Sequence, residues 1–191
     1  MQTASKKVVN GWAMYDWSNS VYNLVITTTF FPAYYAAVTS TKNFPDGIKF
    51  FGRNFKNTEI KDYVMSFSFL MVVLLIPILS SISDYKGNKK NYMRFFCYLG
   101  ALSCSLMFFF DKDHVWLGLI CLLFAGIGFY GSLVFYNSYL PEIAAKEDMD
   151  RISAKGFAMG YIGSVILQMI GFAMVVMMPD NEGLALKITF L

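Results

Sequence analysis

Two long uncharged runs of apolar residues, joined by one short basic segment, constrain the fold of this chain more than any other feature. The runs cover residues 63–82 and 95–110. Because a helix rises about 1.5 Å per residue, about 20 such residues cross the apolar core of a bilayer. The joining segment, residues 83–90, reads Ser-Asp-Tyr-Lys-Gly-Asn-Lys-Lys. A tight positive turn between two spans predicts a cytoplasmic helical hairpin.

The composition favours a membrane protein over a soluble helical one. Hydrophobic residues make up 56% of the chain and charged residues 15%, whereas soluble domains carry about 25% charged residues. The charges also gather between the apolar runs. The net charge of +3 is small and does not indicate nucleic-acid binding. We therefore predict an all-α, polytopic membrane helical bundle.

We predict about five complete transmembrane helices and the start of a sixth. The predicted spans are residues 9–38, 60–83, 92–110, 115–139 and 152–178, followed by 184–191. The last segment covers only about 12 Å of a ~30 Å apolar core. The basic residues are denser on the side that holds Lys6 and Lys7, which predicts a cytoplasmic N-terminus. Residues 39–59 are predicted to form an irregular external loop, with a short interfacial helix as an alternative.

No residue pattern indicates a metal, a cofactor or an enzyme. Cys97, Cys104 and Cys121 lie inside apolar runs without Cys-x-x-Cys spacing, so neither a disulfide framework nor a metal site is indicated. The lone histidine, His114, lies in a short loop. No His/Asp/Glu cluster, Ser–Lys pair or His-Glu-x-x-His motif accompanies the spans. We therefore expect a protein that is not an enzyme and needs no cofactor.

Small residues inside the spans predict close helix packing. Residues 126–131 match Gly-x-Gly-x-x-Gly, a pattern that binds dinucleotides only where a strand turns into a helix. Here it lies inside an apolar span, where small residues let helices approach one another in lipid. Gly156 and Gly160 are spaced as Gly-x-x-x-Gly, and Gly163 follows. This spacing predicts that the fifth span packs tightly against a neighbour.

Asp16 lies within the first predicted span, where a carboxylate must face protein or a water-filled cavity. One interpretation is proton coupling or contact with a substrate amine. The other is an interfacial acid that pairs with a cytoplasmic lysine or arginine. Asn19 and Asn23 follow at positions +3 and +7 and are predicted to share its face. They are candidate substrate contacts or polar links between helices.

The later spans add further candidates. Asn137 lies near the end of the fourth span, and Gln168 within the fifth makes either an interhelical hydrogen bond or a substrate contact. The candidate cavity is lined by the first, fourth and fifth spans. Pro141 is expected to end the fourth helix. Glu142 then caps the following helix, or pairs with Arg151 or with the basic hairpin.

The hairpin has a plain and a functional interpretation. It is either an ordinary positive turn or part of a gate on the cytoplasmic side. In the gate, Asp84 accepts hydrogen bonds from a helix N-terminus or an arginine, and Lys89 and Lys90 face lipid phosphates. Gly87 permits a sharp reversal of the chain.

The hairpin also carries a family resemblance. Residues 80–90 resemble the signature between helices two and three of the major facilitator superfamily, Gly-x-x-x-Asp-[Arg/Lys]-x-Gly-[Arg/Lys]-[Arg/Lys]. Asp84, Gly87 and Lys89 fit this signature. Ser80 stands where glycine is usual, and a tyrosine follows the aspartate where a basic residue is usual.

Three further stretches look like the vacuole-effluxer-like branch of that superfamily, and the resemblance covers essentially the whole chain. They are residues 10–20, 135–144 and 152–163. The Tyr-Asp-Trp segment at residues 15–17 is the most specific part. The branch takes its name from a fungal vacuolar amino-acid exporter linked to autophagy.

The resemblance implies a transporter of about twelve helices in two six-helix halves that works by alternating access. Residues 1–191 would supply most of the first half, as a truncated N-terminal portion that is inactive alone. The implied solutes are small and include amino acids. In relatives of this fold the hairpin aspartate, here Asp84, contacts the opposite half and helps to hold the outward-facing state.

The expected partners are the lipid bilayer, a small-molecule solute, and the missing C-terminal half or a second copy of the chain. The expected location is the bacterial inner membrane. The alternative function is that of a membrane structural or assembly subunit that transports nothing.

Overall fold

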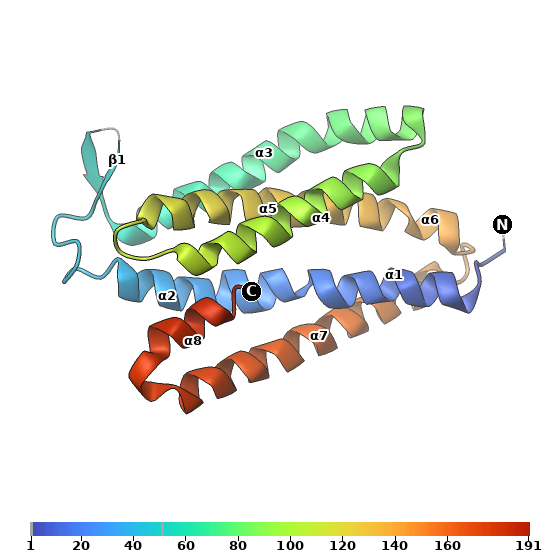
Figure 1. The fold of residues 1–191 in the computed structure, drawn as a ribbon. Helices are drawn as coiled ribbons and strands as arrows, with labels where there is room; N and C mark the ends of the chain where they lie inside the picture. The colour runs from blue at the N-terminus through green and yellow to red at the C-terminus, as the bar shows by residue number, and fades with distance from the viewer. Residues whose placement is uncertain (1, 51) are drawn as a thin grey trace.

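The first membrane span consists of three helical segments that follow one another along a single line (Figure 1). The computed structural model describes residues 2–50 and 52–191, except for the side chains of residues 83, 84 and 86. Helix α1 covers Lys6–Asn19, the π-helix η1 covers Tyr22–Phe30, and α2 covers Phe31–Val38. Together they match the predicted first span.

A run of threonines accompanies the widened turns of η1. The hydroxyls of Thr27, Thr28 and Thr29 donate to backbone carbonyls five residues earlier, at 3.1, 2.7 and 2.8 Å. Threonine hydroxyls compete in this way for carbonyls inside helices. Pro32 follows in the first turn of α2, where it supplies no N–H to the segment before it. The threonines and the proline together account for a local departure from α-helix, which is often found at functional sites.

The remaining spans lie close to their predicted positions. They are α3 (Asn57–Lys86), α4 (Lys89–Leu106) with the 3₁₀ turn η2 (Met107–Phe109), α5 (Val115–Ser138) and α7 (Met149–Met177). Short elements complete the chain: α6 (Leu140–Ile143), η3 (Pro179–Asn181) and α8 (Glu182–Ile188). Among the described residues, four helices are long and apolar enough to cross a membrane. With the three-part first span and the short α8, the predicted all-α polytopic bundle is confirmed.

The loop of residues 39–59 differs from its prediction. It contains a two-stranded antiparallel hairpin, β1 (Ile48–Phe50) and β2 (Arg53–Phe55), and no interfacial helix among its described residues. Gly47 precedes the hairpin with φ at +79°, and a Cβ there would lie 2.3 Å from the carbonyl oxygen of Phe55. Only glycine fits that backbone. The turn residues therefore favour a hairpin over a helix in this loop.

Helix α5 is the central helix of the bundle and packs on α4 and α3. Of its apolar window, 61% is buried in the protein, against 6% for α3. A Cβ at Gly128 would lie 2.4 Å from the backbone nitrogen of Gly100 in α4. One at Gly126 would lie 2.4 Å from Ser68 Oγ in α3. The Gly-x-Gly-x-x-Gly stretch is therefore a packing surface, which confirms the prediction.

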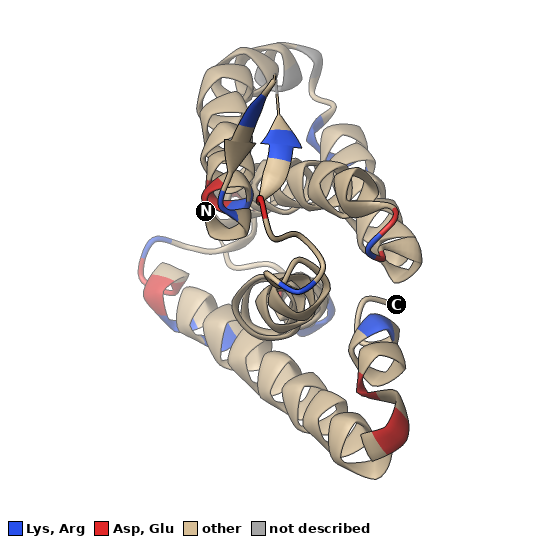
Figure 2. Cartoon of the chain, turned by 90° about the vertical axis from the view of Figure 1, so that its left-hand side faces the viewer, with Lys and Arg blue, Asp and Glu red and all other residues tan. Residues whose placement is uncertain are grey.

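Charged residues lie mainly near the ends of the helices, with long uncharged stretches between them (Figure 2). Large apolar side chains on α3 and α7 are exposed, among them Val73, Val176 and Met177. Such a surface fits the apolar core of a bilayer and not water. The architecture is that of an integral, multi-pass membrane protein.

Candidate functional site

One side of α1 packs tightly on α7 through a row of glycines, the α1–α7 seam. A Cβ at Gly156 would lie 2.7 Å from the ring of Trp12, and one at Gly163 would lie 2.7 Å from the carbonyl oxygen of Trp17. A Cβ at Gly160 would lie 2.5 Å from Ser20 Oγ. Any larger residue at these three positions would push the helices apart. This confirms the predicted tight packing of the fifth span and identifies its neighbour as α1.

Asp16 lies in this seam. Its side chain is buried, and Ser20 Oγ donates to its Oδ1 at 3.1 Å. Its Oδ2 faces Gly160 of α7, 3.1 Å from the position of a Cβ there. Among the lysine and arginine side chains that the structure describes, none forms an ion pair with Asp16. The interpretation of an interfacial acid paired with a cytoplasmic cation gains no support from these side chains.

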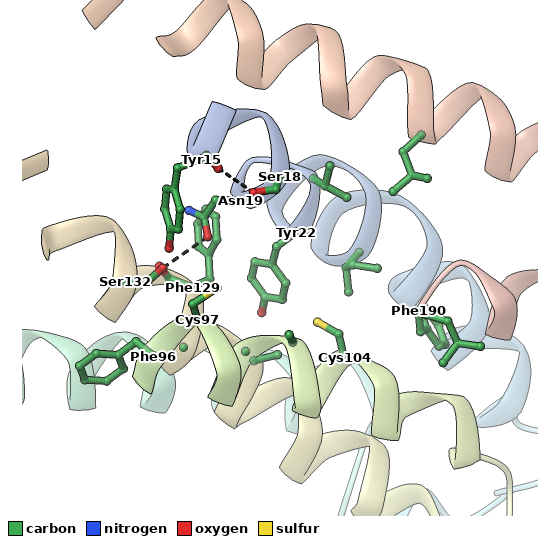
Figure 3. A pocket seen from close by; sticks show the side chains of 18 of the residues that line it. Tyr15, Ser18, Asn19, Tyr22, Phe96, Cys97, Cys104, Phe129, Ser132 and Phe190 are labelled. Atoms are coloured by element: carbon green, nitrogen blue, oxygen red, sulfur yellow. Dashed lines mark hydrogen bonds between the residues drawn. The ribbon is translucent and has the colours of Figure 1, made fainter. Parts of the chain in front are cut away.

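The opposite side of α1 borders a cavity of about 290 Å³. Its walls come from α1, η1, α4 and α5, and the chain end at Phe190 and Leu191 lies at one margin (Figure 3). From α7 it touches only Leu167. The fifth span thus contributes little to this cavity, and α4 forms the wall between α1 and α5 instead. The predicted substrate cavity lined by the first, fourth and fifth spans stays a prediction.

Polar groups without partners face this cavity. Ser132 Oγ of α5 donates to Asn19 Oδ1 at 3.3 Å, and to the carbonyl oxygen of Phe129 at 2.8 Å. Asn19 Nδ2 is buried and has no hydrogen-bond partner within the described residues. The hydroxyl of Tyr15 is also buried, and it lies near Ser132 and Cys97 without a hydrogen bond of ordinary length to either. Figure 3 shows Tyr15 and Asn19 side by side, reaching from α1 toward Ser132. Such orphaned polar atoms are rare in native structures and mark places where a ligand or water can bind.

An aromatic stack joins the cavity to the seam. Tyr136 of α5 stacks on Trp12 at a ring separation of 4.4 Å and on Tyr15 at 5.1 Å. Its hydroxyl is the third buried polar atom without a partner, and it points at Gly156, 3.0 Å from the position of a Cβ there. Asp16 lies within electrostatic reach of both phenols. The stack therefore connects the buried carboxylate on one side of α1 to the cavity on the other.

The structure separates the predicted substrate contacts. Asn19 lines the cavity, Asp16 lies in the seam, and Asn23 and Asn137 are exposed. Gln168 Nε2 donates to Thr29 Oγ1 at 3.2 Å, which is the interhelical bond of the two predicted alternatives. The expected common face for Asp16, Asn19 and Asn23 is wrong.

The basic hairpin between α3 and α4 is held to α6. Lys89 Nζ donates to Glu142 Oε1 at 2.7 Å, so Glu142 pairs with the basic hairpin as one of its alternatives stated. Arg151 pairs instead with Asp148, three residues before it, at 2.7 Å. Gly87 ends α3 with φ at +62°, which confirms the sharp reversal.

The roles predicted for two gating candidates of the hairpin, Asp84 and Lys90, stay predictions. The side chain of Asp84 lies outside the described residues, so its predicted bonds stay predictions. Lys90 is exposed.

Asp148 and Asp111 mark the two ends of the bundle. Donation from the Thr3 hydroxyl and from Arg151 holds the pKa of Asp148 below its ordinary value. At the other end, His114 and the backbone N–H of Asp113 lower the pKa of Asp111 in the same way. Both carboxylates stabilise loop ends, so the lone histidine has a structural partner.

Sequence reasoning missed the aromatic and hydroxyl groups of the site. They are Trp12, Tyr15, Ser132 and Tyr136. Tyr15 and Tyr136 stand in the stretches that carry the family resemblance, which is the one signal that could have pointed to them. Among the described residues, no group of three or more His, Cys, Asp or Glu side chains could hold a metal ion.

Comparison with known proteins gives a consistent result. The family model described as "Vacuole effluxer Atg22 like" matches residues 4–191. An uncharacterized MFS-type transporter, YxiO of Bacillus subtilis, is 33% identical over 171 residues, which cover 90% of this chain and 38% of the relative. Autophagy-related protein 22 of Pyricularia oryzae is 24% identical over 161 residues, which cover 72% of this chain and 24% of the relative.

Autophagy-related protein 22 of Yarrowia lipolytica is 31% identical over 98 residues, or 51% of this chain and 17% of the relative. The chain thus spans less than two fifths of the length of these relatives. No solved structure matches it significantly.

Proposed function

Because the chain belongs to the Atg22-like family of vacuole effluxers within the MFS-type transporters, we propose that it forms the N-terminal helical bundle of a carrier for small solutes. Such carriers work by alternating access between two bundles around a central site. The relatives are longer than this chain, so the second bundle is part of the proposal, as a C-terminal half or a second copy. The bundle alone is proposed to be inactive.

The observation that carries the proposal is the cavity beside α1. It is bordered by two buried polar atoms that lack partners, the Tyr15 hydroxyl and Asn19 Nδ2. A buried donor left unpaired costs about 1–3 kcal/mol. A solute that accepts hydrogen bonds from these atoms would remove that cost. The site is therefore better suited to binding than to packing.

We propose amino acids as the class of solute. The Tyr15 hydroxyl and Asn19 Nδ2 can donate to a solute carboxylate, and Ser132 lies beside them. Asp16 can hold a solute ammonium group, because it is a buried carboxylate near the phenols of Tyr15 and Tyr136. Its access would require α1 to shift against α7 during the transport cycle.

The exposed amides are proposed to contact solute from the central pathway. Asn23 and Asn137 are exposed within or at the end of a span. A polar side chain at membrane depth faces a protein partner or a water-filled path more readily than lipid. Gln168, which donates a hydrogen bond to Thr29 across the seam, is proposed as a further contact.

The cytoplasmic hairpin is proposed to gate the pathway. Lys89 and Glu142 join α4 to α6, and this bond would break or move as the two bundles rock. Asp84, Gly87 and Lys90 belong to the same proposal, together with Arg151 at the start of α7. The gate faces the cytoplasm if the N-terminus does, and the proposed location is a bacterial inner membrane.

The test is solute exchange in proteoliposomes. The protein is purified in mild detergent from its own membrane, so that a second bundle stays attached, and loaded vesicles are given radiolabelled amino acids. We expect exchange with the assembly and none with the 191-residue chain alone. Asn19→Leu should slow exchange at least about tenfold, because a hydrogen bond to a charged solute group contributes about 1.5–3 kcal/mol.

A matched pair of tyrosines provides the control. Tyr15→Phe removes a hydroxyl at the cavity, and Tyr161→Phe removes one from a side chain of α7 that is 70% exposed. Exchange should fall for the first variant and not for the second. Equal loss in both would refute the cavity site. If no solute is exchanged and none raises the thermal stability of the protein, the chain is a structural or assembly subunit.

A further inference from the structure

A second cleft lies between the start of α1 and the start of α7, far from the cavity described above. Its volume is about 440 Å³. Basic side chains from both helices line it: Lys6 from α1, and Arg151 and Lys155 from α7. Thr3 and Asn10 add polar groups to its wall. The cleft therefore gathers positive charge from two helices at one end of the bundle.

The positive charge of the cleft is only partly neutralised. Arg151 forms an ion pair with Asp148, and Lys155 Nζ donates to the neutral amide oxygen of Asn10. Among the side chains that the structure describes, Lys6 has no ion-pair partner. Both α1 and α7 also begin at the cleft, and a helix N-terminus carries a partial positive charge. A net positive site remains, with donors suited to phosphate oxygens.

The floor of the cleft is apolar. Val9 and Ile152 line it and are buried, with relative exposures of 8% and 4%, and they pack with Ala144 in one small cluster. A free inorganic anion would gain nothing from such a floor. A lipid, whose phosphate is joined to a glycerol backbone and acyl chains, matches both the basic rim and the apolar floor.

We infer that this cleft binds the phosphate headgroup of an anionic membrane lipid. Lys6, Arg151 and Lys155 hold the phosphate, and Val9 with Ile152 receives the first part of the acyl chains. The site lies at the end of the bundle that also carries the Lys89–Glu142 bond. The bound lipid ties the start of α1 to the start of α7. This inference does not depend on the solute that the protein carries.

Native mass spectrometry of the purified protein in detergent tests the inference. The probes are phosphatidylglycerol, phosphatidylcholine with the same acyl chains, and inorganic phosphate. We expect phosphatidylglycerol to bind at least about fivefold more tightly than phosphatidylcholine. The double variant Lys6→Gln with Lys155→Gln should lose about tenfold or more of that affinity, since each basic residue near an anionic lipid surface contributes about a factor of five.

Lys7→Gln is the matched control, because Lys7 is the next residue of α1 and does not line the cleft. It should keep the affinity for phosphatidylglycerol. The side chains of Lys6, Lys7 and Lys155 are exposed. A thermal melt of each variant checks that the fold is retained. Equal binding of the two lipids, or an equal loss from Lys7→Gln, would overturn the inference. Displacement of the lipid by millimolar inorganic phosphate would show a free-anion site and overturn it as well.

Discussion

Two sides of helix α1 differ in how closely they pack against their neighbours. Toward α7 it meets a row of glycines and leaves no room for a methyl group at Gly156, Gly160 or Gly163. Toward α4 and α5 it borders a cavity of about 290 Å³ with unpaired polar atoms. The first side is suited to hold two helices in one position. The second side is suited to bind and release a polar molecule.

The difference shows how one small bundle can hold two helices in close contact and still keep a cavity for a ligand. Between membrane helices there is no hydrophobic driving force, so close packing depends on van der Waals contact between small residues. A site cannot be packed so closely, because it must stay open to its solute. If Asn19 contacts solute as proposed, the seam fixes its position relative to α7 until α1 shifts against α7 in the transport cycle. Substitutions on each side of α1 should therefore have different effects.

The largest effect is expected from Gly163→Ala in the seam. The new Cβ would lie 2.7 Å from the carbonyl oxygen of Trp17, and that backbone atom cannot turn away. Overpacking of this kind costs about 1–3 kcal/mol. Thermal unfolding in detergent, followed by size-exclusion chromatography, should show the loss of stability.

Gly11→Ala, in the neighbouring helix α1, is the control. A Cβ at Gly11 meets no atom within 4 Å, and alanine is a better helix former than glycine by about 1 kcal/mol. The variant should be as stable as the parent or more stable. If Gly163→Ala melted like Gly11→Ala, the seam would be looser than the structure indicates.

The seam also shows which part of the helix packing could be predicted from the sequence. The glycine spacing predicted tight packing of the fifth span, because spacing alone decides which residues share a helix face. It could not name the partner, since any helix with a suitable surface would serve. The aromatic side chains Trp12 and Trp17, which fill the space over the glycines, belong to a different part of the chain.

The faces of the polar residues were harder to predict. Asn19 is three positions after Asp16, which on a helix of 3.6 residues per turn leaves the two about 60° apart. That angle is enough to put one in the seam and the other at the cavity. Asn23 lies in η1, where the wider turn changes the direction of every side chain. A threonine run followed by Pro32 was the local signal for this change.

Gln168→Leu tests the polar link within the seam. It removes the 3.2 Å bond to Thr29 Oγ1 and leaves the glycines in place. Hydrogen bonds between membrane helices contribute about 0.6 kcal/mol on average, so the loss of stability should be smaller than that of Gly163→Ala. Gln168→Glu is a useful second variant, because it keeps the shape but lacks the N–H that donates to Thr29 Oγ1. A loss above about 2 kcal/mol for Gln168→Leu would mean that this bond, and not the glycines, holds the seam.

Tyr136→Phe tests the aromatic stack that joins the seam to the cavity. The Tyr136 hydroxyl is buried and unpaired, so its removal should leave thermal stability unchanged or raise it by about 1 kcal/mol or less. The ring stays stacked on Trp12. If the cavity region binds solute as proposed, solute-induced stabilisation should weaken although the protein itself is no less stable. A variant that is markedly less stable would show that the hydroxyl has a structural partner.

The smallest effect is expected from the N-terminal strap, where Thr3 and Arg151 both donate to Asp148 at the start of α7. These bonds hold the pKa of Asp148 below its ordinary value, so the folded protein binds the proton less readily than the unfolded chain does. The stabilisation is therefore complete above the ordinary carboxyl pKa and is lost as the pH falls through the lowered one. The difference in melting temperature between the parent and Asp148→Asn should be present at neutral pH and vanish in acid.

Asp150→Asn is the control for this pH series, because Asp150 also lies in the first turn of α7 and is exposed. Within the described residues it forms no ion pair, so the melting temperature of this variant should follow that of the parent at every pH. A difference for Asp148→Asn that stayed constant or grew as the pH fell would mean that the carboxylate charge does not hold the strap. The strap would then rest on the backbone bond from Ala4 N–H to the Ile143 carbonyl, which no proton can break. The seam would in that case be closed at the N-terminal end of α1 by backbone geometry and not by charge.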